Sequence, residues 1–244
     1  MSDDADLKAE LRRLTRRGFF TMTFAAAAGA ASWTWLRTRP REGGLQWPYR
    51  RVLEANESIA RGYFSTSRLS PTFRQSDISR ARINGRLGLE PPIDLAAWRL
   101  RIEGAAGPLL LTLDDIKALP QHEMITELRC IEGWSTIVQW KGARLADLMA
   151  RFPPANDAEY VSLETPGRGY YVGLELESAL HPQTLLAYEM NGAALPLLHG
   201  APLRLAIPVK YGIKNIKRIG TIRYTKVRPA DFWAERGYDW YAGH

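Results

Sequence analysis

Cys130 is the only thiol in this chain of 244 residues. It stands in the segment RCIEGW, after residues typical of a strand and before Gly133, which permits a sharp turn and close approach to a ligand. A lone cysteine cannot form an internal disulfide, so it is a buried apolar side chain, a reactive group or a metal ligand. We expect Arg129 and a nearby basic field to favour the thiolate, a soft ligand for transition metals. An inert buried cysteine is the alternative.

Short strands must position this cysteine, because segments that alternate apolar and polar residues recur along the chain. The alternation predicts strands over residues 98–104, 124–130, 159–165, 169–176, 203–209 and 218–225. Two short helices are predicted over 112–119 and 144–152, and a helical turn opens the segment 178–192. Strands dominate and no fixed repeat is present, so the sequence predicts an α+β fold with a strong β bias.

The first 36 residues have the pattern of a targeting segment. Arg16 and Arg17 precede an uncharged, alanine-rich stretch at 18–36, whose small residues offer a cleavage site. The TRRGFF core resembles a twin-arginine export signal. This uncharged stretch is also just long enough for an uncleaved membrane anchor, which is the alternative. We therefore expect a leader or anchor at 1–36, a linker and extended arm at 37–75, and the main domain at 76–244.

The charge of the chain limits its partners. The net charge is +7 and the isoelectric point is about 9.6, which favours anionic partners. The sequence has no basic run interleaved with aromatic residues and no zinc-finger or RNA-recognition pattern, so we expect no nucleic-acid partner. It also lacks the cysteine motifs of haem attachment and of iron–sulfur clusters, so any electrons must be exchanged with a separate partner.

Two motif blocks are more specific than the composition. RCIEGWSTIVQWKGARLADLM spans residues 129–149, and LHPQTLLAYEMNGAALPLLHGAPLRLAIPVKYGIKNIKRI spans 180–219. Together they resemble the sulfite oxidase superfamily of molybdopterin enzymes, and within it the small bacterial type related to the periplasmic methionine sulfoxide reductase. The resemblance implies a single domain with the sulfite-oxidase fold and a molybdenum–molybdopterin cofactor (Mo-MPT).

The roles of individual residues come from this resemblance. It implies that Cys130 supplies the one protein thiolate to molybdenum, while the pterin supplies the other sulfurs. The other implied cofactor contacts are Asn84, Thr165, His199, Arg204, Asn215, Ile216 and Lys217, the last three partly through the backbone. Among them, His199 and Arg204 would contact the pterin and its phosphate, and Thr165 would line its channel. Asn84 replaces an asparagine from a segment that this chain lacks, and His199 stands where the reductase has asparagine.

The resemblance implies an exported enzyme for two-electron oxygen-atom transfer on a small S-oxide or a related small molecule. Its expected location is the periplasm, where it would exchange electrons with a membrane cytochrome b that carries haem. An uncleaved anchor at 18–36 would tether it to the inner membrane. One alternative is a sulfite dehydrogenase that passes electrons to a soluble cytochrome. The other is an exported binding module that has the fold but no metal.

Overall fold

The computed structural model describes the backbone of residues 2–244 and the side chains from residue 12 onward. The chain divides into two compact units, with the boundary between Val52 and Leu53. The first unit holds helix α1 (Ser2–Arg37), the two-stranded β1 (Arg41–Glu42) and β2 (Leu45–Gln46), and the start of α2 (Trp47–Tyr63). No helix in the described part of the chain is long and apolar enough to cross a membrane. This includes α1, which contains the stretch 18–36 that was considered as a membrane anchor.

The region 37–75 is partly helical, although the sequence predicts an extended arm. Helix α2 has 17 residues and buries Glu57, whose carboxylate lies 2.6 Å from a guanidinium nitrogen of Arg228. This helix is amphipathic, because its apolar residues recur at the spacing of a helix turn and lie on one face. The chain then becomes extended, and Thr72 forms a bridge with Thr126 of the main domain. This bridge attaches the end of the segment 37–75 to β5.

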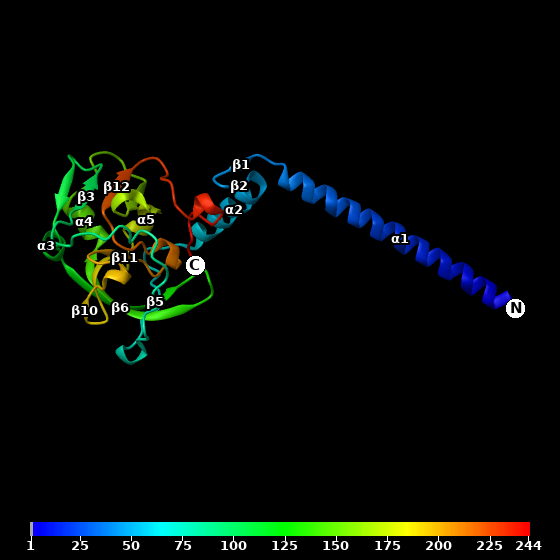
Figure 1. Cartoon of the computed structure of the whole chain (residues 1–244), viewed down its shortest axis with the longest axis horizontal. Helices are drawn as coiled ribbons and strands as arrows, with labels where there is room; N and C mark the ends of the chain where they lie inside the picture. Colours follow the sequence, from blue (N-terminus) through cyan, green and yellow to red (C-terminus); the bar gives the residue numbers. More distant parts are fainter. Residues whose placement is uncertain (1) are drawn as a thin grey trace. The chain divides into compact units, whose positions relative to one another are not determined.

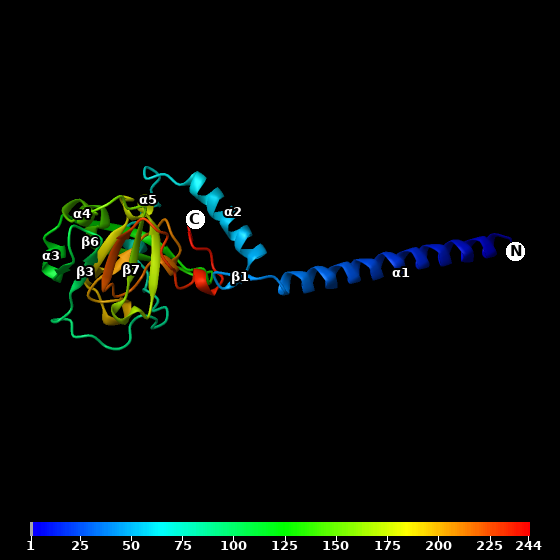
Figure 2. The same cartoon turned by 90° about the horizontal axis from the view of Figure 1, so that it is seen from above.

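Within the described residues, the unit from Leu53 onward contains two five-stranded sheets (Figures 1 and 2). One sheet has the order β10-β9-β6-β5, with β11 also paired to β9. Its strands are β5 (Gln121–Arg129), β6 (Ser135–Arg144), β9 (Leu185–Met190), β10 (Ala193–Ala194) and β11 (Arg204–Ala206). The other sheet has the order β4-β3-β12-β7-β8, in which β12 runs parallel to β3 and antiparallel to β7. Its strands are β3 (Leu100–Glu103), β4 (Leu109–Leu111), β7 (Tyr160–Glu164), β8 (Tyr171–Glu175) and β12 (Thr221–Thr225).

Short helices connect these strands. The α-helices are α3 (Leu113–Lys117), α4 (Leu145–Arg151) and α5 (Leu176–Ala179), and Figure 2 shows α3 and α4 at one end of the unit. The 3-10 helices are η1 (Gln75–Asp77), η2 (Pro166–Arg168), η3 (Leu197–His199), η4 (Gly212–Lys214) and η5 (Ala234–Arg236). The strands and helices that the sequence predicts are present, which confirms the α+β class.

The larger apolar core draws on both sheets and on the two neighbouring helices. Its fully buried members include Leu100, Ile102, Ile116, Leu145, Leu148, Leu186, Leu205 and Ile222. A second core lies on the other face of β9, where Leu185 and Ala187 pack with Val138 and Trp140 of β6. Because β9 is buried on both faces, its sequence LLAYEM lacks the alternation that marks a half-buried strand. The sequence therefore does not mark β9 as a strand.

The contact between β6 and β9 depends on one glycine. The register of the two strands shifts between Lys141 and Gly142. A Cβ atom at Gly142 would lie 2.1 Å from the backbone oxygen of Leu186, far inside the contact distance of a carbon and an oxygen atom. The two backbones can therefore approach this closely only because residue 142 has no side chain.

Candidate functional site

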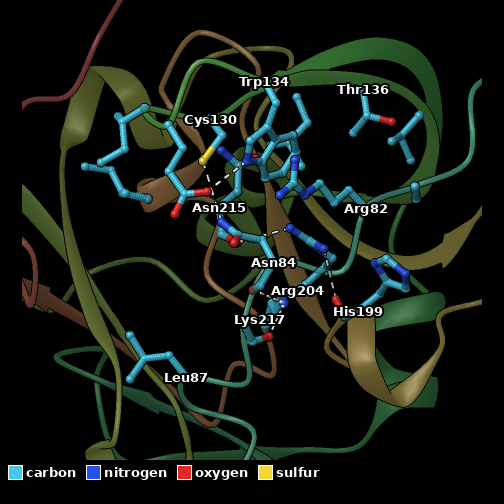
Figure 3. Close-up of a pocket in the computed structure, with 18 of the residues that line it drawn as sticks. Arg82, Asn84, Leu87, Cys130, Trp134, Thr136, His199, Arg204, Asn215 and Lys217 are labelled. Carbon is cyan, nitrogen blue, oxygen red and sulfur yellow. Dashed lines mark hydrogen bonds between the residues drawn. The ribbon is translucent and has the colours of Figure 1, made fainter.

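One cavity of about 510 Å³ brings together most of the residues that the resemblance implicates (Figure 3). Six of the eight predicted site residues line it: Asn84, Cys130, His199, Arg204, Asn215 and Lys217. Thr165 and Ile216 do not line it. The walls come from the loop 81–87, the end of β5, the inner face of β6 and the segment 199–217, so residues far apart in the sequence converge here.

Cys130 follows the last residue of β5 and is buried in the cavity wall. A tight turn holds it, because its N–H donates to the carbonyl of Trp134 at 2.9 Å and its own carbonyl accepts from the N–H of Gly133 at 3.1 Å. Gly133 has a φ of 86°, the left-handed conformation that favours glycine, which confirms the predicted turn. The amide nitrogen of Asn84 donates to Sγ at 3.6 Å, the one side-chain hydrogen bond to this sulfur among the described residues.

The thiol of Cys130 is not activated by its protein surroundings. Burial is the largest influence and raises its pKa, and the charge of Glu132 adds to this; the backbone N–H groups of Glu132 and Ile131 and the charge of Arg82 oppose it without reversing the shift. The expectation that Arg129 favours the thiolate was wrong, because the guanidinium of Arg129 lies 2.7 Å from the carboxylate of Glu127 instead. A thiolate at this position therefore needs a stronger cation than the chain provides, and a bound metal ion is such a cation.

Lys217 fixes the loop that carries Asn84. Its ammonium group donates to the backbone carbonyls of Asn84 at 2.7 Å and of Gly85 at 3.0 Å. Asn84 thereby receives a hydrogen bond from Lys217 at its backbone and donates one to Cys130 from its side chain. Asn84 therefore lies between the sulfur of Cys130 and the cationic part of the cavity (Figure 3).

The other part of the cavity holds two cations, the buried Arg204 and the half-buried Lys217. The guanidinium of Arg204 is fully buried, donates to the carbonyls of His199 and Asn215 at 3.0 and 3.2 Å, and lies 4.6 Å from the ring centre of Trp140. Among the described residues, no carboxylate lies within ion-pair distance of Arg204 or Lys217. Burial lowers the pKa of Arg204 to about 10 and, together with the charge of Arg204, that of Lys217 to about 8.

An anion bound here would neutralise the charges of Arg204 and Lys217. Burial and the charges of Arg204 and Lys217 also lower the pKa of His199, so the imidazole is neutral near pH 7 and can donate or accept a hydrogen bond. The buried Arg204 and the half-buried Lys217, with no carboxylate partner among the described residues and beside a neutral histidine, are the donor set that a phosphate group requires. The residues present therefore fit a phosphorylated cofactor whose metal reaches Cys130.

Asn215 shapes the wall of the cavity and has few free polar atoms. Its side-chain oxygen accepts from the N–H of Ile207 at 2.9 Å, and its side-chain nitrogen donates to the carbonyl of Tyr211 at 3.2 Å. Its backbone carbonyl accepts from Arg204. The side chain thus holds the loop 207–215 in shape, although it also faces the cavity.

Thr165 and Ile216 act behind the wall. The Thr165 hydroxyl donates to the carbonyl of Tyr170 and accepts from its N–H, at 3.1 and 3.0 Å. The side chain of Ile216 is part of the larger core, and its backbone N–H and C=O pair with Lys214 and Leu205. Both residues support neighbours that line the cavity, and the structure shows no group of either that faces it.

Several residues of the cavity were not predicted. Arg82 lies over the ring of Trp134, 5.0 Å from its centre, and both side chains line the cavity beside Cys130. Trp233 and Tyr238 of the aromatic C-terminal tail also line it. Their side chains are brought here by the tertiary fold, and no spacing in the sequence indicates it. The abundance of aromatic residues in DFWAERGYDWYAGH was the one available signal.

A metal ion bound here must take most of its ligands from elsewhere. Among the described residues, no group of three or more histidine, cysteine, aspartate and glutamate side chains is placed to hold a metal ion. A cofactor that brings its own sulfur ligands, with Cys130 as the one protein ligand, fits this arrangement.

Comparisons with known proteins agree with the chemistry of this cavity. The chain is 33% identical over 192 residues to a protein of Azospira oryzae named as a protein-methionine-sulfoxide reductase subunit, YedZ1, covering 77% of this chain and 73% of that protein. It is 38% identical over 157 residues to the reductase catalytic subunits MsrP of Xanthomonas campestris and Xanthomonas axonopodis, covering 58% of this chain. The alignment spans only 49% of those two subunits, about half of their length.

A solved structure and a family model extend these similarities. The sulfane dehydrogenase SoxCD of Paracoccus pantotrophus has a similar fold, with a TM-score of 0.52 and 19% identity over 56% of this chain and 40% of that one. The model described as "Oxidoreductase molybdopterin binding domain" matches residues 88–233, which is more than half of the chain. This chain therefore belongs to the family of oxidoreductases with a molybdopterin-binding domain, and it is a molybdenum-cofactor enzyme with the sulfite-oxidase fold.

Proposed function

We propose that this chain is an exported oxidoreductase that transfers an oxygen atom to or from a small S-oxide or related substrate. Molybdopterin bound with its metal would supply the two-electron oxygen-atom chemistry. The relatives named as methionine-sulfoxide reductase subunits support the substrate class. A membrane cytochrome b is the proposed electron partner, because the sequence carries no haem or iron–sulfur motif of its own.

One observation carries the proposal: a single cavity contains a thiol at one end and a pair of uncompensated cations at the other (Figure 3). Cys130 would bind the metal, and Asn84 would donate to its sulfur. Arg204 and Lys217 would neutralise the phosphate, with the neutral His199 beside them. Cys130 would therefore hold the metal, and Arg204 and Lys217 would hold the phosphate of the same bound cofactor.

The remaining predicted contacts have indirect roles in this proposal. Asn215 would keep the loop 207–215 in the conformation that presents Lys217, and Ile216 would anchor that loop in the core. Thr165 would act through Tyr170. The side chains of Arg82, Trp134 and Tyr238 would then surround the space that is left for the substrate.

The proposed location is the periplasm, reached by the twin-arginine route. Arg16 and Arg17 ahead of the alanine-rich stretch support this assignment. A fusion of residues 1–44 to a reporter should reach the periplasm, and replacement of Arg16 and Arg17 by lysine should keep it in the cytoplasm. Export that survives this replacement would contradict the twin-arginine route.

Molybdenum content tests the site. The full chain and Cys130→Ala should be purified from a host that makes the cofactor, and metal should be measured by mass spectrometry. We expect about one molybdenum per wild-type chain and loss of metal or an altered visible spectrum in the variant. Ser162→Ala is a matched control, since Ser162 is buried in β7 and does not line the cavity. A metal-free wild type from a competent host would contradict the proposal.

Activity then separates the two directions of electron flow. Reduction of a methyl sulfoxide by a reduced viologen dye supports the proposed reaction. Reduction of a soluble cytochrome by sulfite, without sulfoxide reduction, would instead identify the sulfite dehydrogenase of the alternative.

A further inference from the structure

Two buried lysines hold the loop that forms one wall of the cavity. This wall loop, residues 207–217, contributes Gly212, Ile213, Asn215 and Lys217 to the cavity lining. Lys210 and Lys214 point away from the cavity, and both are about 1% exposed. A fully buried ammonium group requires a partner, so the partners of these lysines show what the wall loop is attached to.

Lys214 attaches the wall loop to the C-terminal segment, residues 229–243. Its Nζ lies 2.6 Å from Oδ2 of Asp231 and donates to the carbonyl of Gly173 at 2.7 Å. The other oxygen of Asp231 accepts from the N–H groups of Trp233 and Ala234, at 3.1 Å each, and so begins the 3-10 helix η5. One carboxylate therefore joins the wall loop to the start of η5.

The C-terminal segment also faces the cavity. Trp233 and Tyr238, which flank η5, both line it, and their rings pack edge to face with centres 5.1 Å apart. Tyr238 is 40% exposed, so it lies where the cavity opens to solvent. The N–H of Tyr238 donates to the carbonyl of Trp233, which makes the two residues one rigid turn.

We propose that Asp231 is a positioning residue. Through its ion pair with Lys214 it fixes Trp233 and Tyr238 relative to the wall loop, and thereby sets the opening through which a substrate reaches the cofactor. The proposal rests on the assignment of this cavity as the cofactor site. Asp231 itself does not line the cavity, so it acts through the residues that do.

Hydrogen exchange in the metal-free full-length protein tests the coupling. Lys214→Met removes the ammonium group on the wall loop and leaves the cap at Asp231 intact. The amides of residues 233–238 should then exchange about tenfold faster or more, while those in the middle of β5 and β6 should change less than about twofold. Asp231→Asn keeps an oxygen for the cap but breaks the ion pair, and it should speed exchange of the amides of residues 214–216 by a similar factor.

Lys210 provides the matched control. It is as buried as Lys214 and belongs to the same loop, but its Nζ lies 3.1 Å from Glu175 and donates to the carbonyl of Tyr241, which lies in the C-terminal segment beyond residues 233–238. Lys210→Met should disturb the wall loop and leave exchange at residues 233–238 within about twofold of wild type. Equal effects of both lysine variants at 233–238 would overturn the proposal, because exchange would then report general loss of stability.

A charge-free pair covers the case in which a single variant fails to fold. Lys214→Met combined with Asp231→Asn leaves no unpaired buried charge and should fold. Its residues 233–238 should still exchange faster than in wild type, and in the loaded enzyme KM should rise about tenfold with unchanged molybdenum content. Wild-type exchange in this double variant would overturn the proposal. A wild type without molybdenum would contradict the proposed function instead, and the exchange experiment would still decide the coupling.

Discussion

Replacing Thr165 by valine separates a structural role from a direct cofactor contact. The structure pairs its hydroxyl with both backbone groups of Tyr170, away from the cavity. Valine has nearly the same shape but no hydroxyl, so the buried N–H of Tyr170 loses its acceptor. The carbonyl of Tyr170 keeps a second donor, the backbone N–H of Thr165 at 2.9 Å.

The expected loss of stability follows from the one backbone N–H that is left without an acceptor. A buried N–H without a partner costs about 1–3 kcal/mol. For a domain of this size, each kcal/mol lowers the melting temperature by about 2–4 °C, which gives a fall of about 2–12 °C. Thr165→Ser keeps the hydroxyl and loses one methyl group, so it should cost about 1 kcal/mol.

Thermal unfolding of the metal-free protein, followed by circular dichroism, measures this loss. The molybdenum content of Thr165→Val that folds should stay close to wild type. A wild-type melting temperature together with lost molybdenum would refute the reasoning, because the hydroxyl would then act on the cofactor directly, as the resemblance implies.

Three further outcomes are expected. Burial lowers the pKa of His181, whose Nδ1 accepts from the N–H of Gln183, so below about pH 6.5 the unfolded chain binds more protons than the folded chain. The free energy of unfolding, measured with urea, should therefore fall as the pH is lowered from 7.5 to 5. This fall should be smaller in His181→Asn. Gly142→Ala should cost about 3 kcal/mol or more, seen as lost soluble protein or a lower urea midpoint, since its Cβ meets the oxygen of Leu186; an unchanged midpoint would contradict the close approach. Inorganic phosphate should raise the melting temperature of metal-free wild type and have less effect on Lys217→Met, because an anion that binds only the folded state stabilises it; equal shifts would contradict the anion site.

The sequence determined the elements that depend on local patterns. Half-buried strands such as β3 and β12 alternate apolar and polar residues, so their positions were predictable without a fold. The turn after Cys130 was equally local, because a glycine at 133 allows the left-handed backbone that it requires. The arm at 47–63 was the exception, since its helical period was not recognised and an extended segment was predicted.

The candidate site was predictable only as a set of residues that a family resemblance groups together. Composition and spacing left three possible roles for Cys130: a buried apolar side chain, a reactive group or a metal ligand. The family resemblance favoured the metal ligand and added the other cofactor contacts. Neither could show that Thr165 and Ile216 lie behind the wall, since a residue next to a site in sequence can point to either side of its strand or loop. The resemblance grouped the segments that converge, but it implied that Thr165 lines the pterin channel, whereas the structure pairs the Thr165 hydroxyl with Tyr170.

The sequence by itself determined the class of fold and the motif around Cys130, because both depend on patterns among neighbouring residues. Only the tertiary structure decided the electrostatics. Arg129 was expected to activate the thiol but pairs with Glu127, while the buried Arg204 and the half-buried Lys217 share one cavity with no carboxylate partner among the described residues. Burial and pairing depend on which distant segments pack together, and a charge in the sequence carries no information about either.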